Sequence, residues 1–166
     1  MYTMGKTIPF ISGERYSAIN DCLSNLRVEL SAACVLLADV SGQLITDVGV
    51  TEGLDISNLV SLLAGGFVST REMARYLGEK EGMNLHFHEG ELFDIYAANV
   101  GNDLFLILLF DRSVQTSRIG MVWLYTKRAI SELVKIIASP DDMESKEIIS
   151  EDFTASLKDE LDNIFD

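Results

Sequence analysis

The sequence is poor in cysteine, histidine and long apolar runs, and each shortage argues against a class of protein. Two cysteines and two histidines occur among 166 residues. A membrane-spanning helix needs about 20 mostly apolar residues in a row, and no such stretch is present, so we expect no integral membrane segment. The first residues lack the long apolar centre of a secretion signal. We therefore expect a cytoplasmic protein.

Cys22 and Cys34 are an isolated pair, one in a helical pattern and one in a strand pattern. Their spacing fits neither a metal site nor a disulfide framework, so we expect both to be small core residues. His86 and His88 are two residues apart in a predicted strand and project from one face, where they could ligate zinc. No third ligand has suitable spacing, so we expect no metal.

The motifs of nucleotide-binding and hydrolytic sites are also missing. The chain has no G-x-x-x-x-G-K-[ST] phosphate loop, no G-x-S-x-G elbow and no grouping of cysteine and histidine that would form a nucleophile. We therefore expect no cofactor, no GTP bound by this chain itself and no active site of its own.

Basic residues are scarce relative to acidic ones. The sequence has 13 lysines and arginines against 26 aspartates and glutamates, a formal net charge of −13. Nucleic acids and anionic membranes attract clustered cations, so this charge argues against both as partners. Another protein is the expected partner.

The negative charge is concentrated near the end of the sequence. From Ser139 to Asp166, ten acidic and two basic residues give a net −8, which leaves −5 of the total −13 for the first 138 residues. The stretch "ASPDDMESKE" has the proline and the polar composition of an exposed linker. We expect an N-terminal extension at 1–13, one globular domain at 14–138, an acidic linker at 139–150 and an amphipathic helix at 151–166.

The last of these segments repeats apolar residues at helical spacing, with Ser150 as a plausible N-cap. A helix this short is marginal alone in water, so its apolar stripe needs a surface, either on its own domain or on a partner. The stripe consists of Phe153, Leu157, Leu161, Ile164 and Phe165.

Inside the globular domain, strand patterns and helix patterns alternate. Continuous apolar runs at 32–39 and 104–110 are typical of central strands covered on both faces. Stretches that mix polar with apolar residues, at 43–49, 83–89 and 92–100, indicate flanking or edge strands.

Short glycine-containing links favour hairpin turns between these strands, because glycine accepts the positive φ that such turns require. The links are Ser41-Gly42, Glu89-Gly90 and Gly101-Asn102. Together with helical patterns at 14–30, around 56–77 and at 117–137, they predict an α/β (α+β) fold. It is a three-layer sandwich, with a five-stranded antiparallel sheet that carries one long helix on one face and two on the other.

The outer helices have apolar faces that should be buried. In the first helix this face holds Tyr16, Ile19, Leu23, Leu26 and Leu30. In the last it holds Ile119, Val122, Trp123, Ala129, Ile130, Leu133 and Ile137.

The middle helix contains Gly65 and Gly66 side by side, although each costs about 1 kcal/mol relative to alanine in a helix. At about 100° per residue, one side of this helix should face the sheet. That side holds Ile56, Val60, Leu63, Phe67, Ala74 and Leu77. Two other groups of residues lie on the remaining sides. One, the Gly65 stripe, consists of Ser61, Gly65, Val68, Glu72 and Arg75, and the other, the Gly66 flank, consists of Leu62, Gly66, Ser69, Met73 and Tyr76.

Several of these features, in this order, resemble the roadblock (dynein light-chain roadblock) family, and within it the MglB-like bacterial regulators of a Ras-like GTPase. The similarity rests on the order of the elements and on four sequences: "HEGE" from His88 to Glu91, the small-residue helix "LLAGGFVSTREMARYLGE", the run "LFLILLFD" and the closing "EDFTASLKDELDNIFD".

The resemblance implies a homodimer whose sheets join edge to edge and whose middle helices lie antiparallel, forming a platform for a small Ras-like GTPase. It implies stimulated GTP hydrolysis, through positioning of the GTPase's own catalytic residues, and a closing helix that touches the GTPase and affects nucleotide exchange. It also implies that His88 bonds the adjacent turn. Family members often have alanine where Val68 and Glu72 stand here.

Two adjacent glycines thin the helix toward two directions about 100° apart. We therefore expect the Gly66 flank to meet a second copy of the chain and the Gly65 stripe to meet the GTPase. The alternative is that the glycines let the helix sit close to its own sheet. Asp55 is expected to be the N-cap of this helix.

Other functions remain open from the sequence. The chain could be a roadblock adaptor that binds a GTPase or another roadblock protein without changing its rate, or a ligand-binding domain. Most exposed basic residues are expected to be solvated, although an arginine could instead reach the active site of a GTPase. The residues in question lie in the segment "TKR", from Thr126 to Arg128, and at Arg71, Arg75, Arg112 and Arg118.

Overall fold

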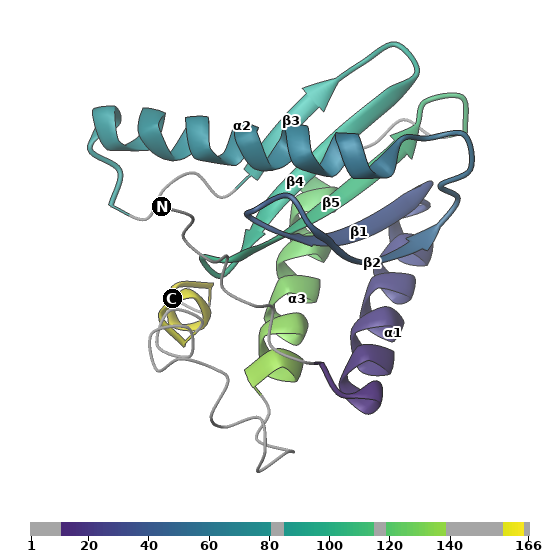
Figure 1. Ribbon diagram of the computed structural model, residues 1–166, viewed down its shortest axis with the longest axis horizontal. Helices are drawn as coiled ribbons and strands as arrows, with labels where there is room; N and C mark the ends of the chain where they lie inside the picture. Colours follow the sequence, from purple (N-terminus) through teal and green to yellow (C-terminus); the bar gives the residue numbers. More distant parts are fainter. Residues whose placement is uncertain (1–10, 81–84, 115–118, 139–157, 165–166) are drawn as a thin grey trace, which may run out of the picture.

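The computed structural model describes residues 11–80, 85–114, 119–138 and 158–164. In this part of the chain, five antiparallel strands form one sheet in the order β2-β1-β5-β4-β3, and helices lie on both of its faces (Figure 1). The helices are α1 (Gly13–Leu30), α2 (Ile56–Leu77) and α3 (Ile119–Ala138). The strands are β1 (Cys34–Asp39), β2 (Leu44–Gly49), β3 (Leu85–Glu89), β4 (Phe93–Val100) and β5 (Leu104–Asp111).

The two continuous apolar runs are the central strands β1 and β5, as predicted. Their alternate side chains enter two separate cores, because helices cover both faces of the sheet. Leu37 and Leu106 face α1 and α3, whereas Leu36 and Ile107 face α2. This arrangement confirms the predicted three-layer α+β fold.

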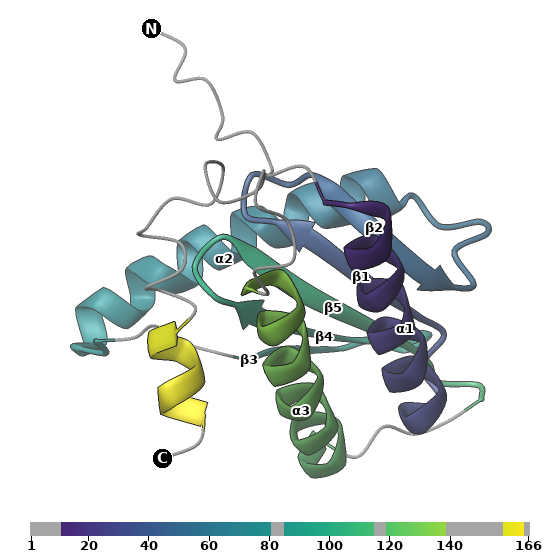
Figure 2. The same cartoon turned by 90° about the horizontal axis from the view of Figure 1, so that it is seen from below.

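A fourth helical segment, residues 158–164, lies on the same face of the sheet as α1 and α3 (Figures 1 and 2). The sequence predicted only two helices on this face. Leu161 and Ile164 are half-buried and pack against the edge of the core there. Of the two surfaces considered for the apolar stripe, the chain's own domain is the one on which these two side chains pack. The other residues of the stripe, Phe153, Leu157 and Phe165, lie outside the described residues.

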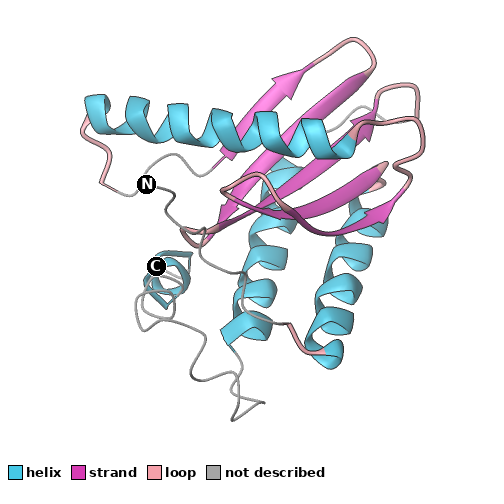
Figure 3. Cartoon of the chain, in the orientation of Figure 1, coloured by secondary structure: helices cyan, strands magenta, loops and turns pink. Residues whose placement is uncertain are grey.

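Some helix-end residues are more exposed than the apolar pattern predicted. Leu77 and Ile119 are exposed, because the last turn of α2 runs beyond the sheet and Ile119 is the first residue of α3 (Figures 1 and 3). Tyr16 is partly exposed, and its hydroxyl accepts a hydrogen bond from Thr46 Oγ1 at 3.0 Å. The segment from Thr126 to Arg128 was expected to carry solvated charges, but Thr126 itself is buried on the inner side of α3.

The three predicted hairpin turns are present, but their glycines serve different needs. Gly42 and Gly101 adopt positive φ, 95° and 64°, which strains other residues. Gly90 does not. A Cβ at Gly90 would lie 2.5 Å from the carbonyl oxygen of Phe93, so this turn needs glycine for space.

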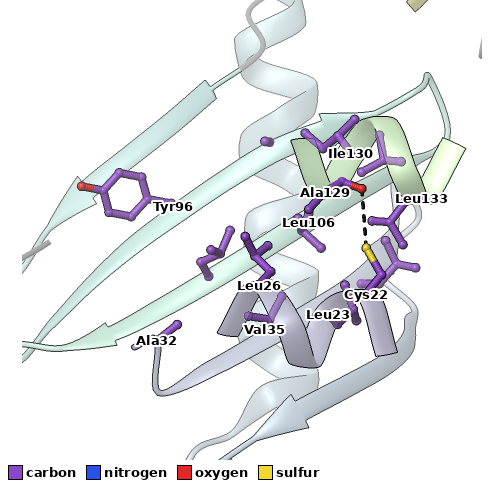
Figure 4. Close-up of a cluster of buried hydrophobic side chains, with 14 of the residues drawn as sticks. Cys22, Leu23, Leu26, Ala32, Val35, Tyr96, Leu106, Ala129, Ile130 and Leu133 are labelled. Carbon is purple, nitrogen blue, oxygen red and sulfur yellow. Dashed lines mark hydrogen bonds between the residues drawn. The ribbon is translucent and has the colours of Figure 1, made fainter. Parts of the chain in front are cut away.

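Both cysteines are free thiols in the core, as predicted. Cys22 Sγ lies 3.7 Å from the carbonyl oxygen of Ala129, where α1 packs against α3 (Figure 4). Burial raises the pKa of Cys22 to about 12 and that of Cys34 to about 11, from an ordinary value of 9.0.

We therefore expect neither thiol to react with Ellman's reagent at pH 8 in the native protein, because only the thiolate is nucleophilic. Both should react once denaturant unfolds the chain. Since the folded state holds these protons more tightly, stability should decrease as pH rises from about 9 toward 12. Fast labelling of native protein would contradict the buried placement.

The buried hydroxyl of Thr126 has no hydrogen-bond partner among the described residues. Thr126→Val replaces it by a methyl group of the same shape, so we expect the free energy of unfolding to rise by about 1 kcal/mol. Urea unfolding measures the change. The control is Thr70→Val, because Thr70 Oγ1 donates to the carbonyl oxygen of Gly66 at 2.8 Å and its loss should bring no gain.

Candidate functional site

Helix α2 has a capping residue at each end. The side chain of Asp55 accepts a hydrogen bond from the backbone N–H of Asn58 at 3.2 Å, which confirms the predicted N-cap. Gly78 ends the helix in the left-handed conformation, with φ 76°. Between these caps, the helix presents a continuous surface 22 residues long.

Only a narrow side of α2 is buried on the sheet. The buried residues are Val60, Ala64, Phe67 and Ala74. The Phe67 ring packs against Phe105, with centroids 4.7 Å apart, and against His86 at 4.1 Å. Most of the helix surface is therefore open to a partner.

The Gly66 flank is exposed and largely apolar. The exposed fractions of Leu62, Met73 and Tyr76 are 75%, 53% and 85%, and Ser69 Oγ is turned back to donate to the carbonyl oxygen of Gly65 at 3.2 Å. Scattered exposed apolar residues are normal, but several on one helix flank form a patch of the kind that proteins cover.

The Gly65 stripe is also exposed and, apart from the exposed Val68, carries small or charged side chains. Ser61 Oγ donates to the carbonyl oxygen of Ser57 at 3.1 Å, and Arg75 pairs with Glu72 at 3.6 Å. A Cβ at Gly42 would lie 3.2 Å from the Ser61 Cα. The β1–β2 turn thus borders the stripe, a contact that the sequence did not reveal.

The two glycines face open space. A Cβ built on Gly65 or Gly66 meets no atom within 4 Å among the described residues, apart from the helix's own nearby backbone. The alternative that they let α2 sit close to its own sheet is therefore wrong.

The flank and the stripe lie on different sides of α2. Thr70 Oγ1 is 3.5 Å from His86 Nδ1 on β3, and at about 100° per residue Gly66 and Met73 lie within about 60° of Thr70 around the helix. On the far side of the stripe, Arg71 Nη2 donates to the carbonyl oxygen of Asn102, in the β4–β5 turn, at 2.6 Å. The Gly66 flank therefore lies toward β3, which is an edge strand of the sheet.

A search of solved structures finds MglB of Myxococcus xanthus at 34% identity and a TM-score of 0.68, covering 75% of this chain and 98% of that one. The chain is an MglB-like member of the roadblock family. A gliding protein MglB from Thermus thermophilus is 26% identical, with a TM-score of 0.69 over 80% of this chain and 97% of that one.

The roadblock fold itself extends to more distant proteins. A Roadblock/LC7 domain from Streptomyces avermitilis matches with a TM-score of 0.62 at 12% identity, over 71% of this chain and 96% of that one. No protein-family model matches the chain, and no curated protein does.

In this roadblock protein the "HEGE" turn is held by Arg112, not by His88. Arg112 donates from Nη1 to the carbonyl oxygen of Gly90, and its guanidinium lies 3.5 Å from Glu89 Oε1 and 3.9 Å from the buried Asp94 Oδ1. In the described part of the chain His88 is exposed and makes no hydrogen bond to the turn. The implied role of His88 is therefore wrong, because Arg112 makes the side-chain contacts with the turn instead.

The arginines that were expected to be solvated differ in their surroundings. Arg71 and Arg112 already bind backbone carbonyls of hairpin turns, Arg75 pairs with Glu72, and Arg118 lies outside the described residues. Across the ranges described, no three histidine, cysteine or acidic side chains are grouped to hold a metal ion. Nor does any helix described there have the length and apolar character to cross a membrane.

Proposed function

We propose that this chain is a homodimeric regulator that binds a small Ras-like GTPase and stimulates its GTP hydrolysis, by positioning the GTPase's own catalytic residues. The observation that carries the proposal is the pair of adjacent surfaces on α2: the apolar Gly66 flank beside the small-residue Gly65 stripe. Membership in the MglB-like group of roadblock proteins supports it.

The homodimer follows from the Gly66 flank and β3 together. An unpaired edge strand and an exposed apolar helix flank both need cover, and here they lie on the same side of the domain. A second copy related by two-fold symmetry covers both at once, since β3 pairs with its own symmetry mate and the two α2 helices pack side by side. Gly66 lets the two helix backbones approach closely.

The GTPase docks on the Gly65 stripe, which the second copy leaves open. Small side chains there let a switch loop approach the helix backbone, and the β1–β2 turn beside Ser61 borders the same surface. Phosphoryl transfer depends mainly on alignment and charge stabilisation, so ordering that loop is enough to raise the rate. Arg71 and Arg112 are already bound to their own turns, so neither needs to enter the GTPase active site.

Single-turnover GTP hydrolysis tests this function. A small Ras-like GTPase from the same organism, loaded with GTP, is mixed with excess purified protein, and phosphate release is followed. We expect the rate to rise at least about tenfold, equivalent to about 1.4 kcal/mol of barrier. Binding without a change of rate would instead make the protein an adaptor.

The closing segment 151–166 supplies a second contact with the GTPase and affects nucleotide exchange. Its described residues Leu161 and Ile164 rest on the domain's own core edge, where burial of two half-exposed side chains is worth only a few kcal/mol, so a partner can displace them. Release of fluorescent GDP should slow when the chain ends at residue 157. An unchanged release rate would remove this part of the proposal and leave the hydrolysis assay unaffected.

A further inference from the structure

A cleft of about 550 Å³ opens where α1 ends and the β1, β2, β4 and β5 chains meet. This volume lies within the range of about 300–1,000 Å³ that ligand and side-chain pockets occupy. Its buried and half-buried apolar lining residues, here called its floor, are Ala32, Ala33, Leu54 and Phe93. None of its lining residues belongs to α2, so the cleft is separate from the surface assigned to the second copy and the GTPase.

Three exposed valines also line the cleft. Val28, Val50 and Val114 are 72%, 60% and 75% exposed, and they come from three different parts of the chain. A single exposed valine needs no explanation, but three around one apolar cleft form a patch typical of interaction sites.

The wall beside Val50 is held in place by hydrogen bonds to one carbonyl oxygen. The oxygen of Ala33 accepts from Arg27 Nε at 3.2 Å and from the backbone N–H of Val50 at 2.9 Å. Gly49 has φ 101°, and a Cβ there would collide with the same oxygen and with Arg27. The wall therefore exists before any ligand binds, which lowers the entropy cost of binding.

Acidic groups dominate the charge of the cleft. Glu52 and Asp111 line it, and neither forms an ion pair with any described residue. Hydrogen bonds from Ser113 lower the pKa of Asp111, so its carboxylate stays ionised. Among the described residues that line the cleft, Arg27 is the only cation, and its Nε already donates to the carbonyl oxygen of Ala33. The chain as a whole carries a formal net charge of −13, which also favours a basic partner.

We propose that this cleft is a second docking site, which binds a segment of another protein that presents apolar side chains flanked by lysine or arginine. The apolar side chains occupy the floor between the valines, and the flanking cations pair with Glu52 and Asp111. The electrostatic match favours a basic segment over an acidic one. Because the cleft and α2 share no residue, one copy of the chain can hold this partner and a GTPase together.

Methyl NMR of the full-length protein tests the proposal with two synthetic probes. One is a short acetylated peptide with a central Leu-Phe-Leu sequence and lysines on both sides, and the other has glutamates in place of the lysines. We expect saturable shifts at the methyl groups of Val28, Val50 and Val114 with the lysine peptide, and unshifted Leu62 and Val68 on α2. The glutamate peptide should bind at least about fivefold more weakly.

Charge reversal separates a docking site from general attraction to an acidic protein. Glu52→Lys should weaken the lysine peptide about tenfold, whereas the matched variant Asp21→Lys, on the exposed surface of α1, should change it less than about twofold. Equal binding of the two peptides, equal effects of the two variants, the largest shifts at Leu62 and Val68, or no saturable shift would each overturn the proposal. None of these results depends on the GTPase assay.

Discussion

The Gly66→Arg variant is expected to be monomeric at concentrations where the proposed wild-type dimer forms. An arginine side chain at this position would project into the space that we assign to the second α2 helix, at the centre of the apolar Gly66 flank. We expect the dimer dissociation constant to rise at least about a hundredfold, equivalent to about 2.8 kcal/mol. Sedimentation velocity over a range of concentrations measures it.

The matched variant is Gly65→Arg, one residue earlier and about 100° around the helix. It should leave the dimer intact and abolish binding of the GTPase in a pull-down. A Cβ at either position meets no atom of the described residues within 4 Å outside the helix's own nearby backbone, and each substitution removes a helix glycine at a gain of up to about 1 kcal/mol. At protein concentrations low enough for the wild type to be monomeric as well, both variants should therefore melt at or above the wild-type temperature.

Each arginine variant is expected to lose one contact with a partner without losing stability as a folded monomer. Loss of assembly in a variant that unfolds could be trivial, whereas loss of assembly in a variant that is as stable as the parent assigns the surface. If both arginine variants remain dimeric and still bind the GTPase, the assignment of the Gly66 flank and the Gly65 stripe is wrong.

Arg112→Ala is expected to lower the free energy of unfolding by about 2–3 kcal/mol. The substitution removes the donor to the carbonyl oxygen of Gly90 and takes a cation away from Asp94, which is only 3% exposed. For a chain of this size the melting temperature should drop by about 4–12 °C. Thermal unfolding followed by circular dichroism measures it.

Two controls test the physical cause. Adding Asp94→Asn to Arg112→Ala should recover part of the loss, because it removes the buried charge that was left without its cation. Arg71→Ala removes another arginine bound to a hairpin carbonyl but at an exposed site, so it should cost less than about 1 kcal/mol. Equal losses for Arg71→Ala and Arg112→Ala would rule out the buried carboxylate as the cause.

Arg112 also has consequences for assembly. It holds the turn between β3 and β4, and β3 is the edge strand through which we propose that the sheets join. Arg112→Ala should therefore weaken the proposed dimer as well as the fold, while leaving residues on the outer side of α2 unchanged. This dependence links a hairpin contact to the proposed function.

The sequence predicted the fold well because apolar periodicity reports directly on burial. The runs containing Leu36 and Ile107 are continuous, and both strands are covered on two faces. Prediction was weaker at helix ends. Leu77 has the periodicity of a core residue but is exposed, because the last turn of α2 lies past the edge of the sheet (Figure 1). Apolar periodicity shows which side of a helix is buried, but it does not show how far the sheet extends beneath the helix.

The candidate site could be predicted only in part. The exposure of Gly65 and Gly66 follows from their position around the helix, and the structure agrees. The contact of Gly42 with Ser61 and the gathering of Val28, Val50 and Val114 carry no local signal. Each of these residues looks like an ordinary turn or apolar residue in its own segment, because contacts between distant segments depend on how the elements pack.

By itself, the sequence determined which segments become helices and strands, which strands lie at the centre, and which residues of α2 remain outside. These properties follow from local periodicity, capping and turn chemistry. Only the tertiary structure decided that Arg112 rather than His88 holds the hairpin, that the Gly66 flank lies on the side of edge strand β3, and that three valines meet at one cleft. The reason is physical: burial patterns repeat along the chain, whereas the choice of neighbour is made when helices and sheet pack together in three dimensions.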